Sequence, residues 1–325
     1  MRKALIVGID YYEHSSSLFG CVNDAHSVNS VLARDSDGTK NFETRLLTGT
    51  GSNSMVLRKD LKGNIKELFH GNPDTALFYF AGHGYIESTG GYLVSSECLE
   101  GDEGLNMREL LEIANKSKAK NKIIILDCCH SGTFGNTSGV EETAILSDGM
   151  TILTASDPDQ YAQEENGSGV FTNLLVDALN GSAANLIGQI SPGSVYAHID
   201  QAIGDWGQRP IFKTNVKKFT TLRKVQSSIS LSDLQKIIEL FPKKGEDFQL
   251  DPTFEPERAE GEADKYPAPI EDNTEKFEIL QKYNRVNLLV PVDAPHMWHA
   301  AMQSKSCKLT VLGEHYWNLV KKDRI

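Results

Sequence analysis

Short runs of consecutive apolar residues alternate with longer amphipathic segments over the first two thirds of the chain. Four such runs predict strands covered on both faces, as in a parallel sheet: residues 4–9, 76–80, 123–126 and 151–155. Apolar positions at helical spacing predict helices at about residues 22–34, 54–70, 105–118, 170–180 and 193–205. This alternation predicts an α/β fold with a mostly parallel open sheet flanked by helices. A ligand or active site is then expected at the carboxyl ends of the strands.

The pattern changes beyond residue 224, where we place the end of the α/β domain (residues 1–224). Residues 225–241 predict a connecting helix. Residues 242–278 hold 12 acidic and 5 basic residues and 5 of the chain's 11 prolines, which is typical of a linker or an extended wrap. Residues 279–325 hold 7 basic and 3 acidic residues and predict a small appended module, either α/β or helical.

Composition narrows the class of protein. The 325 residues carry 33 basic and 44 acidic side chains, a formal net charge of -11, which argues against nucleic acid as a partner. Since no apolar run approaches the ~20 residues of a membrane helix, we expect no membrane association. Five irregularly spaced cysteines do not form a disulfide framework, so a reducing, cytoplasmic location is expected. Cys/His pairs at zinc-binding spacing are lacking, which predicts no metal site.

Reactive side chains follow two of the predicted strands. One strand leads into Ala81-Gly82-His83-Gly84, and another into Asp127-Cys128-Cys129-His130-Ser131-Gly132. A Cys and a His from neighbouring strand ends form a nucleophile and base pair, in which the imidazole takes the thiol proton. The sequence therefore predicts thiol chemistry at this edge of the sheet.

These motifs resemble those of the caspase/metacaspase clan of cysteine proteases, on the metacaspase side. The 46-residue step from His83 to Cys129 is similar to the caspase interval of about 50. The resemblance covers roughly residues 1–215 and implies a caspase-like sheet of about six strands. It also includes other segments: Gly20-Cys21-Val22-Asn23-Asp24-Ala25, Ala155-Ser156, Gln160-Tyr161-Ala162 and Phe171-Thr172.

The resemblance implies a role for each matched residue. Cys129 is the nucleophile and His83 the base, and the backbone N–H groups of Gly84 and Cys129 stabilise the oxyanion. Asp24 and Asp127, with Cys21, line the S1 pocket and receive an Arg or Lys side chain at P1. The alternative for Asp24 is a cap on the helix that follows it.

Two neighbours of these motifs receive a separate interpretation. Strand alternation turns Cys128 away from Asp127 and Cys129, so Cys128 is expected to be a packing residue. Ala81 stands where metacaspases often have Ser.

One long segment lacks basic residues. Residues 123–208 contain no Lys or Arg and 11 acidic residues. This segment is expected to attract basic substrates. A protease that cleaves after Arg or Lys finds no site in it, so we expect an enzyme that works as a single chain. The alternative is chance together with a solvated acidic surface.

Regulation is less well specified by the sequence. The resemblance implies no required cofactor, and calcium dependence stays open because the candidate oxygens lack EF-hand-like spacing: Asp102, Glu103, Glu141, Glu142 and Asp148. The arrangement resembles bacterial caspase-like anti-phage effectors, in which a partner enzyme makes a nucleotide second messenger that activates the protease. On that analogy a nucleotide would be sensed by C-terminal residues through stacking and charge: Trp298, His299, Trp317 and Arg324.

Two alternatives for the C-terminal segment stay open, because it could instead cover the active site or form a small core of its own. The alternative function is a catalytically silent caspase-fold scaffold in a signalling complex.

Overall fold

The computed structural model describes residues 1–87, 90–99, 104–128, 145–155, 164–165, 168–203, 209–257 and 265–325. The chain divides into two compact units, Met1–Gln226 and Ser227–Ile325. Each unit buries apolar residues of its own. Among the described residues, no helix has the length and apolar character needed to cross a lipid bilayer.

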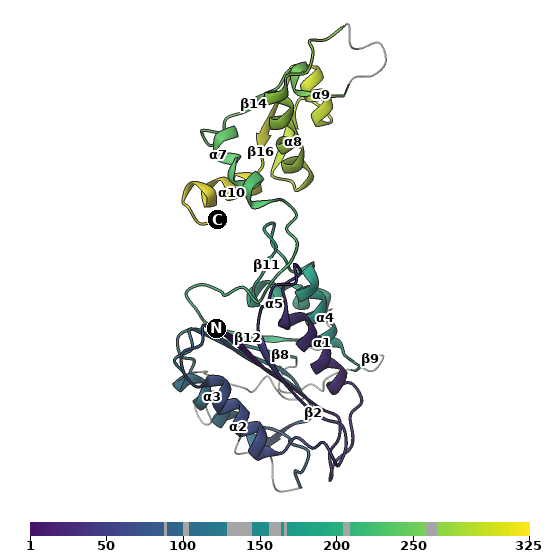
Figure 1. Cartoon of the computed structure of the whole chain (residues 1–325), viewed down its shortest axis with the longest axis vertical. Helices are drawn as coiled ribbons and strands as arrows, with labels where there is room; N and C mark the ends of the chain where they lie inside the picture. The colour runs from purple at the N-terminus through teal and green to yellow at the C-terminus, as the bar shows by residue number, and fades with distance from the viewer. Residues whose placement is uncertain are drawn as a thin grey trace. The chain divides into compact units, whose positions relative to one another are not determined.

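The first unit is built on a six-stranded sheet with the strand order β12-β8-β7-β3-β1-β2 (Figure 1). Its strands are β1 (Arg2–Ile9), β2 (Glu43–Gly49), β3 (Thr75–Ala81), β7 (Asn121–Asp127), β8 (Met150–Thr154) and β12 (Ile211–Asn215). All neighbouring strands pair in parallel except β12, which runs antiparallel to β8 at one edge. The predicted α/β fold with a mostly parallel sheet is confirmed.

The four strands predicted from apolar runs are the four central strands of this sheet. Every described position of β3 and β8 is buried, because helices cover both faces. The edge strands β2 and β12 lack such runs and were not predicted. Glu43 and Arg45 in β2, and Thr214 and Asn215 in β12, are exposed, as is usual for strands with one neighbour.

Helices form a layer on each face of the sheet. Helices α1 (Cys21–Ala33), α4 (Val170–Asp177) and α5 (Pro192–Ala202) contribute to the apolar cluster on one face. Helices α2 (Arg58–Phe69) and α3 (Met107–Lys116) contribute to the cluster on the other. The π-helical segment η2 (Ala178–Ser182) continues α4. These helices lie where the periodicity predicts them, with ends that differ by a few residues (Figure 1).

The described residues of the first unit also form three small sheets. They consist of β4 (Gly84–Glu87), β5 (Gly90–Leu93) and β6 (Leu105–Asn106), of β9 (Glu164–Glu165) and β10 (Ser168–Gly169), and of β11 (Gln189–Ile190) and β13 (Arg223–Lys224). Just before β13, the backbone carbonyls of Thr221 and Leu222 accept hydrogen bonds from Arg2. The Arg2 guanidinium also lies 4.1 Å from the centre of the Phe42 ring. Arg2 therefore fastens the end of this unit to the start of β1.

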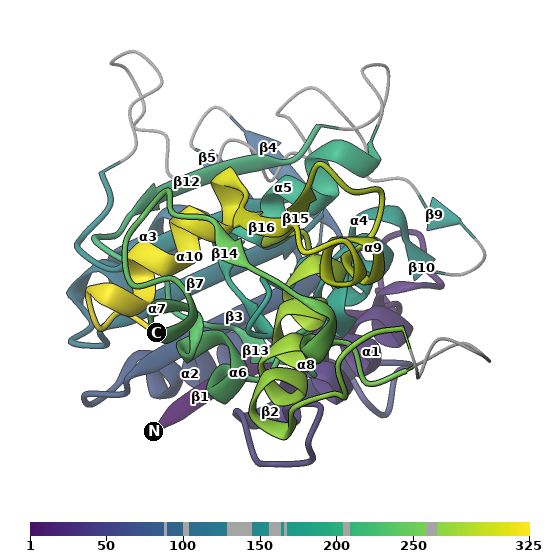
Figure 2. The same ribbon diagram turned by 90° about the horizontal axis from the view of Figure 1, so that it is seen from above.

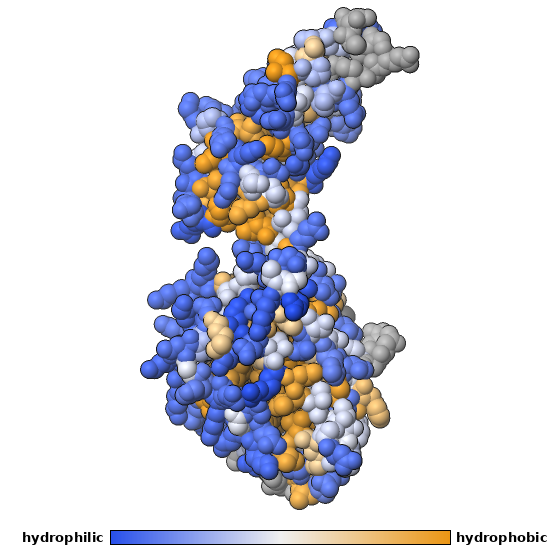
Figure 3. Space-filling model, viewed as in Figure 1, coloured by the Kyte–Doolittle hydropathy of each residue, from blue (hydrophilic) through white to orange (hydrophobic). Residues whose placement is uncertain are grey.

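The second unit is a small α/β module. Its antiparallel sheet has the order β14-β16-β15, with β14 (Phe248–Gln249), β16 (Ser306–Leu309) and β15 (Leu289–Val292). Its helices are α6 (Leu231–Gln235), α7 (Ile237–Leu240), η3 (Pro252–Phe254), α8 (Glu271–Arg285), α9 (Met297–Met302) and α10 (Val311–Lys321) (Figure 2). Figure 3 shows hydrophobic residues on the face of this unit that carries α7 and α10. The exposed large apolar residues of α6 and α10 are Leu231, Val311 and Leu312.

The structure differs from the sequence expectations in the segment between the two predicted modules. The expected connecting helix is two short helices, α6 and α7, and begins only at Leu231. The expected linker, residues 242–278, supplies β14, η3 and the first half of α8. Phe254 and Phe277 from this segment are 7% and 1% exposed, and their rings meet edge to face. The acidic residues and prolines predict a linker or an extended wrap with little to bury, but the aromatic residues between them form part of the core.

Candidate active site

The carboxyl ends of β1, β3 and β7 meet at one edge of the sheet. In the parallel register Ala81 of β3 lies beside Gly8 of β1 and Asp127 of β7. His83 follows Ala81 by two residues, so the sheet brings it to the edge where Asp127 ends its strand. The expected nucleophile, Cys129, lies outside the described residues.

His83 is held by two segments of the loop that follows β1. Its Nε2 atom lies 2.8 Å from the carbonyl oxygen of Ser16. Its backbone N–H donates to the Tyr12 hydroxyl at 2.7 Å, and the two rings lie 4.6 Å apart. Because a carbonyl oxygen only accepts, Nε2 carries a proton, which leaves Nδ1 as the ring nitrogen that can accept one. This tautomer suits a general base that acts through Nδ1.

Tyr12 is a neutral, buried anchor for His83. Its side chain is 4% exposed, and burial raises the pKa of Tyr12 well above its ordinary value. Gly82 is needed beside it, since a Cβ atom there would lie 2.6 Å from the Tyr12 hydroxyl. Sequence reasoning missed both Tyr12 and Ser16, because they lie in an irregular loop with no motif to mark them.

Asp10 orders the start of the same loop. Its Oδ1 atom accepts the backbone N–H groups of Cys21 and Val22 at 2.9 and 3.2 Å. These are among the first N–H groups of α1, whose N-cap residue, Gly20, makes no side-chain capping bond. Asp10 thus caps α1 from outside the helix. Burial raises the pKa of Asp10 and outweighs the two N–H bonds, which lower it.

The two expected pocket carboxylates come together around Gly169. Asp24 on α1 and Asp127 at the end of β7 are 2% and 7% exposed. The Gly169 backbone N–H donates to Asp24 Oδ2 at 3.0 Å, and the Ser168 hydroxyl donates to Asp24 Oδ1. A Cβ atom on Gly169 would lie 2.7 Å from Asp127 Oδ2 and 3.1 Å from Asp24 Oδ2. Asp24 is therefore not the N-cap of α1, and its carboxylate faces Asp127 and β10.

Two buried hydroxyl groups support Asp127. The Thr172 hydroxyl on α4 donates to Asp127 Oδ2 at 2.6 Å. The Tyr79 hydroxyl on β3 lies 2.6 Å from Thr172 Oγ1. Thr172 belongs to a segment that carries the family resemblance, but no role followed from that. In the sequence, Tyr79 is one more residue of the apolar run that predicts a buried strand, so the pattern gives no sign that its hydroxyl group contacts Thr172.

The structure also describes three other residues that the sequence analysis singled out at this edge of the sheet: Cys21, Gly84 and Cys128. Cys21 begins α1, one turn before Asp24, and is 7% exposed. Gly84 begins β4 directly after His83. Cys128 is 1% exposed and packs in the apolar cluster that contains Tyr12 and Leu126, as expected of a packing residue.

The expected sensor residues belong to two different helices of the second unit. Trp298 and His299 lie on α9, with their rings 5.0 Å apart and edge to face. Trp317 lies on α10, where its indole N–H donates to the carbonyl oxygen of Phe241 at 2.7 Å. Arg324 follows α10. Figures 1 and 2 draw α9 and α10 at opposite ends of this unit, so these residues do not form one cluster.

Metal ligands do not gather in the described part of the chain. No group of three or more His, Cys, Asp or Glu side chains there is placed to hold an ion. Of the carboxylates considered for calcium, Asp148 is described, while Asp102, Glu103, Glu141 and Glu142 lie outside the described residues.

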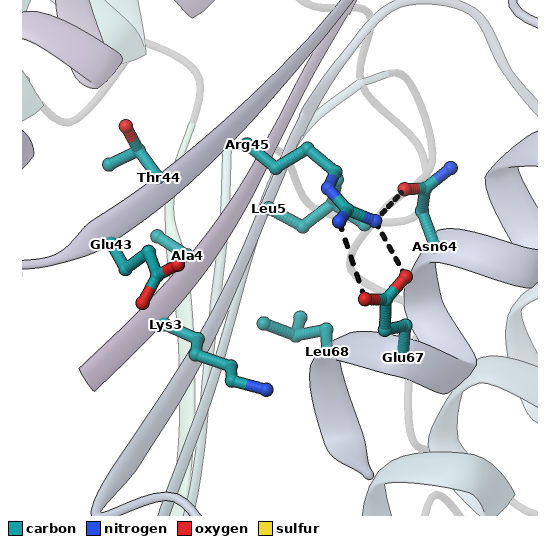
Figure 4. A pocket seen from close by; sticks show the side chains of 9 residues that line it. All are labelled: Lys3, Ala4, Leu5, Glu43, Thr44, Arg45, Asn64, Glu67 and Leu68. Atoms are coloured by element: carbon teal, nitrogen blue, oxygen red, sulfur yellow. Dashed lines mark hydrogen bonds and ion pairs between the residues drawn. The ribbon is translucent and has the colours of Figure 1, made fainter. Parts of the chain in front are cut away.

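A surface pocket of about 120 Å³ lies at the other end of the strands, beside the starts of β1 and β2 (Figure 4). Arg45 points across it to Glu67 and Asn64 on α2. Arg45 pairs with Glu67 through two contacts of 2.7 and 3.3 Å. The pocket contains none of the motif residues.

Comparisons with known proteins match the first unit to a known family. A caspase-domain model matches residues 1–230. Metacaspase-1 of Botryotinia fuckeliana is 26% identical over 213 residues, which cover 58% of this chain and 46% of that protein. Metacaspase-1 of Cryptococcus neoformans is 29% identical over 190 residues, which cover 47% of this chain and 39% of that protein. The chain thus spans less than half the length of these curated relatives.

Solved structures show the same fold. Caspase-1 from Spodoptera frugiperda has a TM-score of 0.50 at 14% identity, over 69% of this chain and 90% of that one. A protein from Geobacter sulfurreducens has a TM-score of 0.51 at 15% identity, over 69% of this chain and 99% of that one. The family supports cysteine peptidase activity, and the match to residues 1–230 identifies the chain as a member of the caspase-domain peptidase family C14.

Proposed function

We propose that this chain is a cysteine endopeptidase that cleaves proteins after Arg or Lys, with Cys129 as nucleophile and His83 as base. The observation that carries the specificity is the pair of buried carboxylates, Asp24 and Asp127, which both approach Gly169. Two carboxylates on one pocket wall attract a cationic P1 side chain and repel an acidic one.

The tautomer of His83 supports the proposed chemistry. With Nε2–H directed at Ser16, Nδ1 takes the proton of the Cys129 thiol, and the thiolate attacks the peptide carbonyl carbon. The backbone N–H groups of Gly84 and Cys129 stabilise the oxyanion. The imidazolium then returns its proton to the leaving amine, and water hydrolyses the thioester.

Charge supports a single-chain enzyme for basic substrates. Residues 123–208 carry no Lys or Arg and 11 acidic residues. Such a segment attracts cationic peptides and offers no bond after a basic residue. We therefore propose activity without cleavage in the segment that follows Cys129.

We further propose that the second unit regulates the protease, with a nucleotide messenger or a partner protein as the signal, in a bacterial antiviral system. Its separate fold supports a regulatory module. Trp317 uses its indole N–H within the unit, so the better candidates for stacking are Trp298, which is 37% exposed, and its neighbour His299.

The test is hydrolysis of matched fluorogenic peptides with Arg, Lys, norleucine or Asp at P1 by the full chain, Cys129→Ala and His83→Gln. Cleavage after Arg or Lys that both substitutions abolish is the expected result. Cleavage after Asp would overturn the pocket assignment. If Cys129→Ala binds the Arg peptide but the wild-type chain does not cleave it, either the protein is a silent scaffold or an activator is missing. Adding extract from a cell that contains the activator distinguishes the two, because only an enzyme that lacks its activator then cleaves the peptide.

A further inference from the structure

We propose that Tyr79 is a positioning residue for the Asp127 carboxylate and acts on it through Thr172. The inference rests on the proposed function, in which Asp127 receives the basic P1 side chain. It adds a pair of hydroxyl groups, Tyr79 and Thr172, which we call the hydroxyl relay, as a determinant of specificity.

Proton counting gives the relay one direction. The Thr172 hydroxyl has a single proton, and it donates that proton to Asp127 Oδ2 at 2.6 Å. The Tyr79 hydroxyl, 2.6 Å from Thr172 Oγ1, must then be the donor in the second bond. The order is therefore Tyr79 to Thr172 to Asp127, and both protons point toward the carboxylate.

Burial makes the relay effective. Tyr79 is 0% exposed and Thr172 1%, so water does not compete for their hydroxyl groups. Burial, together with the nearby Asp127 and Asp24 carboxylates, raises the pKa of Tyr79 well above its ordinary value. Tyr79 therefore stays protonated and keeps its role as donor. In such a low-dielectric site, successive hydrogen bonds also polarise and strengthen one another.

The relay joins three elements at the pocket. Tyr79 lies on β3, Thr172 on α4 and Asp127 at the last position of β7. The terminal torsion of an Asp side chain is broad and weakly restrained by itself. The bond from Thr172 fixes that torsion and holds Oδ2 on the side of Gly169, where Asp24 Oδ2 also lies. A guanidinium group needs such fixed acceptors for paired hydrogen bonds.

A purely structural role for the same bonds makes a different prediction. If the relay only stabilises the fold, loss of the Tyr79 hydroxyl lowers stability and affects all ligands alike. If it orients Asp127, the loss falls on ligands with a positive charge at P1. The ratio of affinities for two peptides that differ only at P1 separates the two roles.

The experiment uses the full chain with Cys129→Ala, so that peptides bind without turnover. Dissociation constants are measured for two peptides, one with Arg and one with norleucine at P1. We expect Tyr79→Phe to lower the Arg-to-norleucine affinity ratio about three- to tenfold. Thr172→Val should lower it further, while Thr172→Ser, which retains a hydroxyl, should keep it. Tyr283→Phe is the matched control, because it removes a buried hydroxyl that donates to the Asp233 carbonyl in the second unit.

Each outcome has one meaning. Absence of an Arg preference before any relay substitution contradicts the proposed function itself. An Arg preference that Tyr79→Phe leaves unchanged overturns the relay and leaves the proposed function standing. Equal losses for both peptides also overturn it, because they indicate a structural role.

Discussion

The hydroxyl group of Tyr12 accepts the backbone N–H of His83 at 2.7 Å while the two rings lie 4.6 Å apart. One side chain thus fixes both the backbone and the ring of the proposed base. The carbonyl oxygen of Ser16 contacts the same ring, 2.8 Å from Nε2. The loop that follows β1 therefore sets the position of a residue that follows β3.

We expect Tyr12→Phe to lower kcat about ten- to a hundredfold with little change in KM, because the base is displaced while the substrate pocket is intact. The unpaired N–H should also cost about 1–3 kcal/mol of stability. Steady-state kinetics and urea unfolding measure the two effects. Tyr196→Phe is the control, since Tyr196 lies on α5 and its ring stacks on Phe212 of β12, with the ring centres 5.1 Å apart. An unchanged kcat would contradict this role for Tyr12.

Gly169→Ala tests the carboxylate pair by steric means. The added methyl group would lie 2.7 Å from Asp127 Oδ2 and 3.1 Å from Asp24 Oδ2. The backbone conformation of Gly169, with φ -68°, is open to alanine, so the clash is confined to the carboxylates. We expect KM for an Arg peptide to rise about tenfold or more, since one factor of ten corresponds to about 1.4 kcal/mol.

Gly63→Ala is the matched control, because a Cβ atom at this position of α2 meets nothing within 4 Å. It should leave KM unchanged and stabilise the helix by roughly 1 kcal/mol. If Gly169→Ala also leaves KM for the Arg peptide unchanged, the pair does not line the P1 pocket.

Asp10→Asn should stabilise the protein at neutral pH. Burial raises the pKa of Asp10 in the folded chain, so its contribution to stability is present in full below the unfolded pKa and lost as pH rises through the folded one. Asparagine keeps an oxygen for the N–H groups of Cys21 and Val22 without the charge. We expect a higher free energy of unfolding than wild type at pH 7, and a difference that disappears toward about pH 3.5.

Asp37→Asn serves as a control of opposite sign. Hydrogen bonds from Thr39 lower the pKa of this exposed carboxyl, so its contribution is present above its unfolded pKa and lost as pH falls. Urea unfolding across the pH range should give Asp37→Asn a lower free energy of unfolding than wild type at pH 7. An Asp10→Asn curve that also lies below wild type at pH 7 would refute the predicted sign.

Phe254→Ala tests whether residues 242–278 belong to the second unit's core. The ring is 7% exposed and meets Phe248 and Phe277 at 5.7 and 6.5 Å. Loss of this ring should lower the free energy of unfolding of the second unit by about 3–5 kcal/mol. Hydrogen exchange should show loss of protection in peptides of residues 227–325 and unchanged protection in residues 1–226. Lys265→Ala, at an exposed position, should change neither the stability nor the hydrogen-exchange protection. If Phe254→Ala also changes neither, the interpretation of residues 242–278 as a linker is restored.

Sequence patterns predict the parts of this molecule that depend on local burial. The strand before His83 and the strand that ends at Asp127 are short, uninterrupted apolar runs, so the positions of both residues at one edge of the sheet follow from the sequence. The edge strand β2 is half exposed and carries Glu43 and Arg45, which leaves no such run. In the expected linker, Phe254 and Phe277 lie too far apart in sequence to reveal that they pack together.

The side chains that support the site depend on contacts between distant segments. Tyr12 and His83 are 71 residues apart, and Tyr79 and Thr172 are 93 apart. Within its strand, Tyr79 is indistinguishable from a core aromatic residue. Only the pairing of strands and the seating of α4 show which polar atom each hydroxyl group reaches.

Arg2 holds the backbone of residues 221–222 beside the start of β1. The first strand of the caspase unit and the segment near its last residues therefore lie side by side. His83 lies beyond the other end of these strands, roughly 25 Å away at about 3.3 Å per residue. Both points lie at the edge of the sheet opposite the proposed catalytic residues. A segment fused before β1 or after Leu222 should therefore change the environment of the proposed catalytic residues little.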